Sequence, residues 1–261
     1  MKIQLLRHAA MLIEYGGVKI LTDPMLGPAG AGAPIPTKKE GRGRRNPLVE
    51  LPLDARELAK TLHSLDAVLI THLHSDHFDD FAGKTLPKDI PLLCQAEDER
   101  RLHEKGFTGL FPIRSELGWA GIRISRVGCR HGGPLIRRKM GMGSGYYLEA
   151  SSEPSLYITG DTIWCPEVKT AIRRHSPDLI IVNTGAAQLP AGRSITMRAG
   201  DVAKVCRAAP EAQVVAVHME AINHCLLTRT QLRTYLEKHH LSNRVHIPAD
   251  GETLAFNRTA P

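Results

Sequence analysis

The sequence predicts an α/β protein in which β-sheets pack face to face and helices cover their outer sides. Three features predict this class. Short apolar runs recur along the chain, amphipathic stretches separate the later runs, and the earliest runs follow one another as the strands of hairpins do. No internal repeat and no linker divides the sequence. We therefore expect one domain over residues 1–261, long enough to bury a sizeable core.

The expected strands are rich in β-branched residues and nearly continuous in hydrophobicity, which is typical of strands buried on both faces. Gly16 and Gly17 form the turn signal between the second and the third of them. In chain order the strands are expected at Ile3–Leu6, Leu12–Tyr15, Val18–Thr22, Ala67–Thr71, Pro91–Cys94, Ile122–Val127, Gly145–Ala150, Leu156–Thr159, Leu179–Asn183, Val214–Val217 and Val245–Ile247.

The amphipathic stretches between the later strands are expected to be helical. Thr196 and Thr228 are the expected N-caps of the last two, because a threonine hydroxyl can accept a hydrogen bond from the first helical turn. The helices are expected at Asp54–Ser64, Glu97–Lys105, Glu167–His175, Arg198–Ala208 and Arg229–His239.

Composition excludes several classes of protein. The chain is 42% hydrophobic and 23% charged, as globular proteins are, and no window approaches 18 consecutive apolar residues, so we expect no membrane span. The apolar run at the N-terminus ends too early for a secretory signal, which predicts a cytoplasmic protein. The five cysteines are widely spaced and form no CxxC pair, so they are expected to be reduced structural thiols.

Most of the positive charge is concentrated in one segment. The net charge is +7, and residues 38–45 (KKEGRGRR) contribute +4 of it. This segment lies in a Gly- and Pro-rich stretch, 27–47, whose length of about 20 residues predicts a functional or mobile loop. It is either a solvated loop or a rim that attracts anions. A nucleic-acid surface would spread its cations along a face, so nucleic acid is not an expected partner.

The strongest chemical signal is the segment HLHSDH at 72–77, directly after an expected strand. It places four candidate ligands within six residues, which is costly unless a cation binds there. His72 and His74 alternate and so project to one side, whereas Asp76 and His77 follow a turn and can face a second position. The spacing predicts a two-metal site rather than a loop of solvated histidines.

Further candidate ligands follow other expected strands. His131 lies in a Gly-rich loop, Asp161 follows a short apolar strand where a carboxylate could bridge two cations, and Asp23 and His218 each end a strand. Each of them alone is more typical of a cap or a turn. Together with the HLHSDH segment they form a consistent set of metal ligands.

The chain resembles the metallo-β-lactamase superfamily, and within it the stand-alone hydrolases that include the ascorbate-6-phosphate lactonase. The resemblance extends from Ile3 to about Phe256. It implies a four-layer αββα sandwich with metals at one edge between the two sheets. The residues that carry it are LTDP at 21–24, THLHSDHFDD at 71–80, His131, GDT at 160–162 and AVHMEA at 216–221.

The resemblance also implies a role for each of these residues. One metal would be held by His72, His74 and His131, and the second by Asp76, His77 and His218. Asp161 would bridge both metals, and Asp76 and Asp161 are the expected catalytic carboxylates. Asp23 would orient a ligand through hydrogen bonds within the 72–77 loop.

Other polar residues near these motifs are open to more than one interpretation. His224 is an alternative to His218 as the last ligand, and we prefer His218 because it sits at a strand end. Glu220, Asn223 and His224 are candidates for contacts behind the ligands or with the substrate. His8 follows the first strand and could approach the site, although we prefer a structural role for it.

Ligands of nitrogen and oxygen without thiolate predict two divalent metal ions, zinc in the first place and manganese or iron as alternatives. Two cations sharing a water lower its pKa to about 7, which predicts a metal-dependent hydrolase that uses a metal-bridged hydroxide. We expect a small anionic ester or lactone as its substrate and a homo-oligomer as its assembly. The candidate contacts to the anion are Lys38, Arg42, Arg44, Arg45 and Arg137.

Two other functions remain open. A phosphodiesterase or nuclease would use the same metals, although no extra arm or inserted domain typical of the RNA-processing branches is present. A metal-binding protein without hydrolytic activity is the second alternative.

Overall fold

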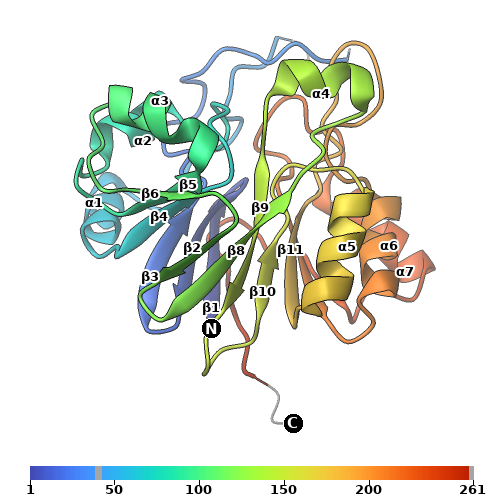
Figure 1. The fold of residues 1–261 in the computed structure, drawn as a ribbon. Coiled ribbons are helices and arrows are strands. Elements are labelled where there is room, and N and C mark those ends of the chain that lie inside the picture. The colour runs from blue at the N-terminus through green and yellow to red at the C-terminus, as the bar shows by residue number, and fades with distance from the viewer. Residues whose placement is uncertain (39–42, 259–261) are drawn as a thin grey trace.

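The computed structural model describes residues 1–38 and 43–258. Its strands form two seven-stranded mixed sheets that lie face to face (Figure 1). The first sheet has the order β14-β1-β2-β3-β4-β5-β6, with β14 Thr253–Ala255, β1 Lys2–Arg7, β2 Ala10–Tyr15, β3 Val18–Thr22, β4 Ala67–Ile70, β5 Leu92–Gln95 and β6 Leu110–Ile113. The second has the order β13-β12-β11-β10-β9-β8-β7, with β13 Val245–His246, β12 Gln213–Val217, β11 Leu179–Asn183, β10 Leu156–Ile158, β9 Ser144–Glu149, β8 Ile122–Gly128 and β7 Glu116–Trp119.

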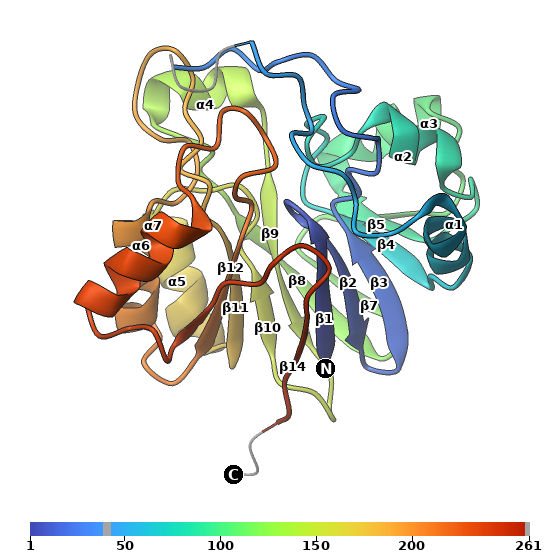
Figure 2. The same ribbon diagram turned by 180° about the vertical axis from the view of Figure 1, so that it is seen from behind.

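Helices cover the outer face of each sheet. Figures 1 and 2 show helices α1 Ala55–His63, α2 Asp80–Thr85 and α3 Glu99–Glu104 on the first sheet. The 3₁₀ turn η2 Ala96–Asp98 directly precedes α3. Helices α5 Pro166–His175, α6 Ala199–Ala208 and α7 Arg229–Lys238 lie on the second, and α4 Pro134–Met140 lies at the end where the long loops gather. The expected αββα sandwich is confirmed.

The alternation of side chains along the strands builds this core. On β12, Val215 and Val217 point into the apolar layer between the two sheets, whereas Val214 and Ala216 pack under α5, α6 and α7. Successive side chains of a strand face opposite sides, and both faces of these strands are covered. The near-continuous hydrophobicity of the sequence follows from that double burial.

The expected strands and helices are all present, with ends that shift by one or two residues. The prediction that Thr196 caps α6 was wrong. The N-cap is Arg198, and the Thr196 hydroxyl instead accepts a hydrogen bond from the Ala187 backbone N–H at 2.9 Å. Thr228 caps α7 as expected, with its hydroxyl accepting from Gln231 N.

The sequence did not predict β6, β7, β14, α2 and α4. The first three are edge strands that are only partly buried, so their patterns lack a continuous apolar run. Helices α2 and α4 are short, with six and seven residues, too few to show helical periodicity. Within the described residues, no helix is long and apolar enough to cross a membrane.

The loop after β3 is anchored from the interior. Arg7, at the end of β1, is fully buried, and its guanidinium donates to the carbonyl oxygens of Met25 and Gly27 at 2.8 Å and of Val49 at 2.9 Å. Both ends of the 27–47 loop are therefore tied to one side chain. Figures 1 and 2 show the described parts of this loop, residues 27–38 and 43–47, at the same end of the molecule as α4.

Candidate metal centre

Five segments that follow strands converge at this end of the sandwich. Asp23 follows β3, residues 71–77 follow β4, His131 follows β8, Asp161 follows β10 and His218 follows β12. Two of these strands belong to the first sheet and three to the second. The candidate ligands therefore meet at the edge between the two sheets, where strand ends from both layers open toward the loops.

Asp161 lies in the middle of the imidazoles. Its Oδ2 is 3.4 Å from the Nε2 atoms of both His77 and His131, and its Oδ1 is 3.2 Å from Nε2 of His218. Gly160 makes this placement possible, because its backbone is left-handed and a Cβ there would approach Ser144 O to 2.5 Å. Asp161 thus stands between two sets of nitrogen donors.

The donors on either side of Asp161 form two compact groups. His72, His74 and His131 bring one ligand atom each to within 4.8 Å of one another. Asp76, His77 and His218 do the same, together with His8. All of these residues are buried except His74, which is partly exposed. The structure brings together every residue that the sequence proposed as a metal ligand.

Hydrogen bonds on the outer side of the rings assign the proton positions of the imidazoles. The Thr71 hydroxyl donates to Asp23 Oδ2 at 2.8 Å, so it must accept from His72 Nδ1 at 3.0 Å. His77 Nδ1 donates to the same Asp23 oxygen at 2.8 Å. Both rings therefore carry the proton on Nδ1 and direct the lone pair of Nε2 inward.

The other two rings of the first group follow the same rule. His131 Nδ1 donates to Ile195 O at 3.0 Å, which leaves its Nε2 free toward Asp161. His74 is reversed, because its Nε2 donates to Met140 O at 2.9 Å and its Nδ1 faces His72 Nε2 at 2.9 Å. Two lone pairs at this distance repel unless a cation or a proton lies between them.

This donor set fits divalent cations. Ligating histidines usually donate their other N–H to a carboxylate or carbonyl, and here four imidazoles do so or reach a carboxylate through one hydroxyl. Asp161 is itself held by the Asn183 amide, which donates to its Oδ1 at 2.7 Å. Inward lone pairs and carboxylate oxygens without thiolate are typical of sites for zinc, manganese or iron.

Electrostatics at the centre favours a proton on His77 and opposes one on His72. Burial opposes the charged form of His77, but the carboxylates of Asp161 and Asp23 outweigh it and raise its pKa well above the ordinary value. Burial together with His77 and His74 holds the pKa of His72 well below its usual range. The carboxylates of Asp161 and Asp23, which favour the charged form of His77, would also attract a metal ion placed beside that ring.

The backbone is strained at three positions of the centre. His8, Asp23 and His218 have φ angles of 62°, 40° and 70°, in the left-handed region that non-glycine residues rarely adopt. Such conformations cost about 1–3 kcal/mol each and persist where the surrounding structure imposes them. Here the backbone turns sharply at the strand ends, which directs the side chains into the space between the sheets.

A cavity of about 640 Å³ opens beside the second group of donors. Asp76 and Asp79 contribute polar atoms to its wall, and Arg101 and Lys105 line another part. The remainder is mainly apolar and comes from the loop after β3, from Leu73 to Phe81 and from Ile222. The apolar residues are Met25, Pro28, Ala31, Ala33, Pro34, Ile35, Pro36, Pro47, Leu73, Phe78, Phe81 and Ile222.

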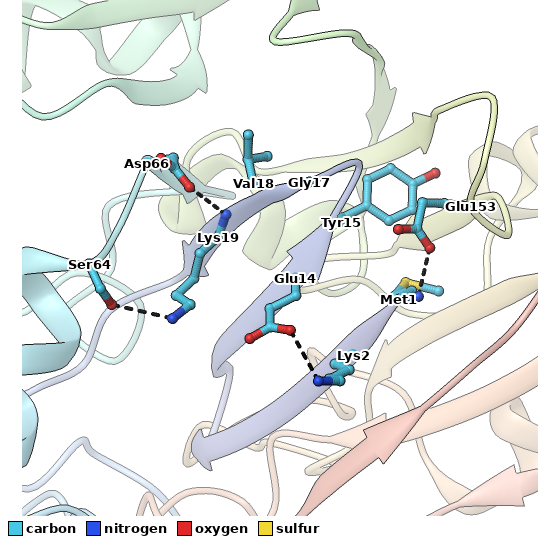
Figure 3. Close-up of a pocket in the computed structure, with 10 residues that line it drawn as sticks. All are labelled: Met1, Lys2, Glu14, Tyr15, Gly17, Val18, Lys19, Ser64, Asp66 and Glu153. Carbon is cyan, nitrogen blue, oxygen red and sulfur yellow. Dashed lines mark hydrogen bonds and ion pairs between the residues drawn. The ribbon is translucent and has the colours of Figure 1, made fainter.

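A second hollow, at the opposite end of the strands, has no such chemistry. Figure 3 shows that its charged groups pair with one another: the N-terminal amine with Glu153 at 2.6 Å, and Lys2 with Glu14 at 3.6 Å. The Lys19 backbone N–H donates to Asp66 at 2.7 Å, and its ammonium donates to Ser64 Oγ at 3.4 Å. No histidine or cysteine is among the described residues that line it.

Three further polar residues predicted near the site have other described contacts. Glu220 binds Arg229 of α7, with its Oε2 2.7 Å from the guanidinium. Asn223 accepts from the Asn46 amide at 2.7 Å and from Ile35 N at 3.0 Å, so it holds the 27–47 loop. His224 is buried beside Cys225, and burial lowers its pKa to about 4.

The predicted anion contacts are only partly described. Lys38, Arg44 and Arg45 are exposed, and none of them lines the cavity beside Asp76. Arg45 donates to Gly30 O at 2.7 Å and to Ala31 O at 2.9 Å, which stabilises its own loop. Arg42 and the side chain of Arg137 lie outside the described residues.

Sequence reasoning missed the residues that orient the ligands. Thr71 and Asn183 look like ordinary strand-end residues, because their roles depend on partners 48 and 22 residues away in the chain. For His8 a structural role was preferred to an approach to the site, and the structure places it beside the second donor group. Its position directly after the first strand is the signal that could have identified it.

Comparison with known proteins agrees with this geometry. The family model described as the beta-lactamase superfamily domain matches residues 19–219, which include all seven candidate ligands. The chain belongs to the metallo-β-lactamase superfamily. The UPF0173 protein YddR of Bacillus subtilis (strain 168) is 35% identical over 98% of this chain and 100% of its own length.

Two solved structures are similar over nearly the whole chain. One is the isothiocyanate hydrolase from Delia radicum gut bacteria, with a TM-score of 0.93 and 33% identity over 98% of this chain and 100% of that one. The other is a possible metal-dependent hydrolase from Veillonella parvula DSM 2008, with a TM-score of 0.91 and 31% identity over 98% and 99%. The chain is a metal-dependent hydrolase of this superfamily. The narrower likeness to the ascorbate-6-phosphate lactonase stays a prediction.

Proposed function

We propose that this metal-dependent hydrolase acts on a small, uncharged electrophile with an apolar substituent, of the isothiocyanate class. The observation that carries the proposal is the cavity beside Asp76, whose wall is mainly apolar and excludes the described cations of the basic loop. The similarity to an isothiocyanate hydrolase, at 33% identity over nearly both chains, supports the same substrate class.

The reaction requires one water and no protein nucleophile. The water oxygen bonds to the central carbon of R–N=C=S, and a proton moves to nitrogen. In the resulting thiocarbamic acid the remaining proton, on sulfur or oxygen, moves to nitrogen as the C–N bond breaks, which releases the amine R–NH₂ and carbonyl sulfide. Divalent cations at the centre would lower the pKa of water to about 7 and offset negative charge on the electrophile.

The residues of the chain would bind the cations, orient the ligands and move the proton. The candidate ligands would hold one cation at His72, His74 and His131 and the other at Asp76, His77 and His218, with Asp161 between them. Asp23, Thr71 and Asn183 keep these side chains in the orientation that directs their donor atoms inward. Asp76 borders the cavity and is the residue best situated to orient the water or deliver a proton to nitrogen.

The anionic ester or lactone expected from the sequence is a second candidate. It is favoured by Arg101 and Lys105, which line the same cavity. Their described ion pairs are long, with 3.9 Å from Arg101 to Asp98 and 3.9 Å from Lys105 to Asp80. Both cations could therefore turn toward an anion in the cavity.

A substrate panel separates the two candidates. The zinc-, manganese- and iron-loaded protein would be assayed with benzyl isothiocyanate, a neutral lactone, a phosphorylated lactone, a thioester, a β-lactam and bis-p-nitrophenyl phosphate. We expect the isothiocyanate to give amine and carbonyl sulfide in equal amounts and at the highest kcat/KM. Faster turnover of the phosphorylated lactone would replace this proposal by the second candidate, and faster turnover of the phosphodiester would favour a phosphodiesterase.

Substitution of Phe81 tests whether the cavity binds the apolar substituent of the substrate. It lines the cavity with 41% of its surface exposed, so Phe81→Ser removes apolar contact to the substituent without opening the core. We expect KM for benzyl isothiocyanate to rise about 10-fold, since an aromatic contact contributes about 1–1.5 kcal/mol, with kcat little changed. The matched control is Phe111→Ser, at 37% exposure on β6 and outside the cavity. Equal effects of both variants would contradict this use of the cavity.

A further inference from the structure

We propose that His8 is a positioning residue for Asp76, to which its Nε2–H donates a hydrogen bond that fixes the direction of the carboxylate. The inference rests on the metal centre described under the proposed function. It concerns how the second group of donors is prepared for a cation, and it does not depend on which substrate is hydrolysed.

His8 connects the two sheets at the centre. It lies between β1 and β2 of the first sheet, is fully buried, and its ring packs on that of His218, which follows β12 of the second sheet, with centroids 3.6 Å apart. The His8 carbonyl oxygen also accepts a hydrogen bond from the His218 backbone N–H at 2.9 Å. Ring and backbone together leave His8 one orientation.

In that orientation His8 reaches Asp76. Its Nε2 lies 3.3 Å from Asp76 Oδ2, whereas the Nε2 atoms of His218 and His77 are 3.8 Å and 4.0 Å from the same oxygen. Among the described residues, no other side chain donates a hydrogen bond to the Asp76 carboxylate. His8 is therefore the contact that determines how this carboxylate is turned.

The surroundings of the second ring nitrogen of His8, Nδ1, indicate whether Nε2 is a hydrogen-bond donor or a metal ligand. His8 Nδ1 is buried, and no residue of the described chain offers it a hydrogen bond. If Nε2 were a metal ligand through its lone pair, Nδ1 would carry the proton and would be a buried donor without an acceptor. With the proton on Nε2, Nδ1 is an unpaired acceptor instead, and the hydrogen bond to Asp76 is made. The outer nitrogens of His72, His74, His77 and His131 all have oxygen acceptors, and that of His218 faces Cys225 Sγ at 3.5 Å, so each of these rings has a partner on its outer side. His8 lacks this feature of a ligating histidine, so its Nε2 carries a proton toward Asp76.

Two variants that differ by one methylene test the role. His8→Gln places an amide N–H near the position of the imidazole Nε2, whereas the amide of His8→Asn ends near the position of Nδ1 and does not reach Asp76. Asparagine also tolerates the left-handed backbone at this position, where φ is 62°, so the shorter variant is expected to fold. The control is His103→Gln, on α3 and outside the donor groups.

The readout is metal binding, measured apart from activity. Each protein would be stripped with a chelator and titrated with cobalt(II), and the d–d absorption and the bound metal per chain would be recorded. For His8→Asn we expect the affinity of the second metal equivalent to fall about 10- to 100-fold while the first is retained. His8→Gln and the control should bind both equivalents as the unaltered chain does, with the same absorption spectrum.

Three results would overturn the inference. If His8→Asn binds both equivalents normally, the hydrogen bond does not position Asp76. If His8→Gln loses the second equivalent as His8→Asn does and changes the spectrum, His8 is a ligand. If the unaltered chain binds a single equivalent, there is no second position to prepare. A chain that binds two equivalents but leaves isothiocyanates intact would refute the proposed substrate and leave the role of His8 standing.

Discussion

Exchange of Asp23 for asparagine tests the orientation of the ligands by their outer hydrogen bonds. Asp23 accepts three of them within 2.8 Å: from the Thr71 backbone N–H at Oδ1, and from the Thr71 hydroxyl and His77 Nδ1 at Oδ2. An amide keeps one acceptor oxygen, so its NH₂ group must face at least one of these donors. The least costly arrangement leaves the Thr71 N–H unpaired and keeps the other two bonds.

The expected loss in free energy of unfolding follows from this unpaired N–H. A buried donor left without an acceptor costs about 1–3 kcal/mol. Asparagine adopts left-handed backbone readily, so the φ of 40° at this position adds no further strain. We expect the free energy of unfolding to fall by about 2 kcal/mol, which corresponds to about 4–8 °C in Tm for a chain of this size. Loss of the negative charge beside His77 is expected to weaken metal binding about 10- to 100-fold.

Thermal unfolding of the chelator-treated protein and titration with a chromophoric metal indicator measure the two effects separately. Asp54→Asn is the matched control, because Asp54 is the N-cap of α1 and asparagine caps helices equally well. An Asp23→Asn protein with the Tm and the metal affinity of the control would refute the reasoning. It would mean that Thr71 and His77 hold their orientation without this carboxylate.

Three further changes have expected outcomes. His72→Ala combined with His74→Ala should abolish turnover and remove at least one metal equivalent, measured by elemental analysis. The control His103→Ala should do neither. Full activity of the double variant would refute the assignment of the site. Arg7→Met should lower the free energy of unfolding by about 3 kcal/mol in denaturant titrations, because three carbonyl oxygens lose a charged donor. A change under 1 kcal/mol would show that other contacts hold the 27–47 loop. Gly185→Ala should weaken metal binding with little loss of secondary structure, since the added Cβ would meet His218 O and lie 2.6 Å from Cys225 Sγ. Unchanged affinity would show that His218 can shift without weakening metal binding.

The layered architecture was predictable from the sequence where strands are buried on both faces. Runs such as Val214–Val217 and Leu179–Asn183 gave nearly correct strand bounds, because covered faces require apolar residues at every position. The edge strands β7 and β14 were not predicted, since a half-exposed strand of three or four residues is too short to show an alternation of apolar and polar residues. Topology came from the resemblance and not from periodicity.

The metal centre was predictable to the extent that its residues stand at strand ends. Imidazoles and carboxylates directly after apolar runs indicated a common edge of the sheets, and the structure brings all seven of them together. Thr71 and Asn183 gave no such signal, because an uncharged side chain that holds a ligand resembles any other polar residue. Asn223 was expected near the ligands, but its partners are in the 27–47 loop, which no local pattern reveals.

The anchoring of the 27–47 loop by Arg7 bears on how relatives of this enzyme could diverge. One guanidinium fastens the chain at Met25 and Gly27 on one side of the loop and at Val49 on the other. Between these attachment points the loop supplies much of the cavity wall but none of the candidate ligands. Natural selection, or a designer who builds chimeras, can therefore exchange this segment to obtain new selectivity while the reacting centre is inherited intact.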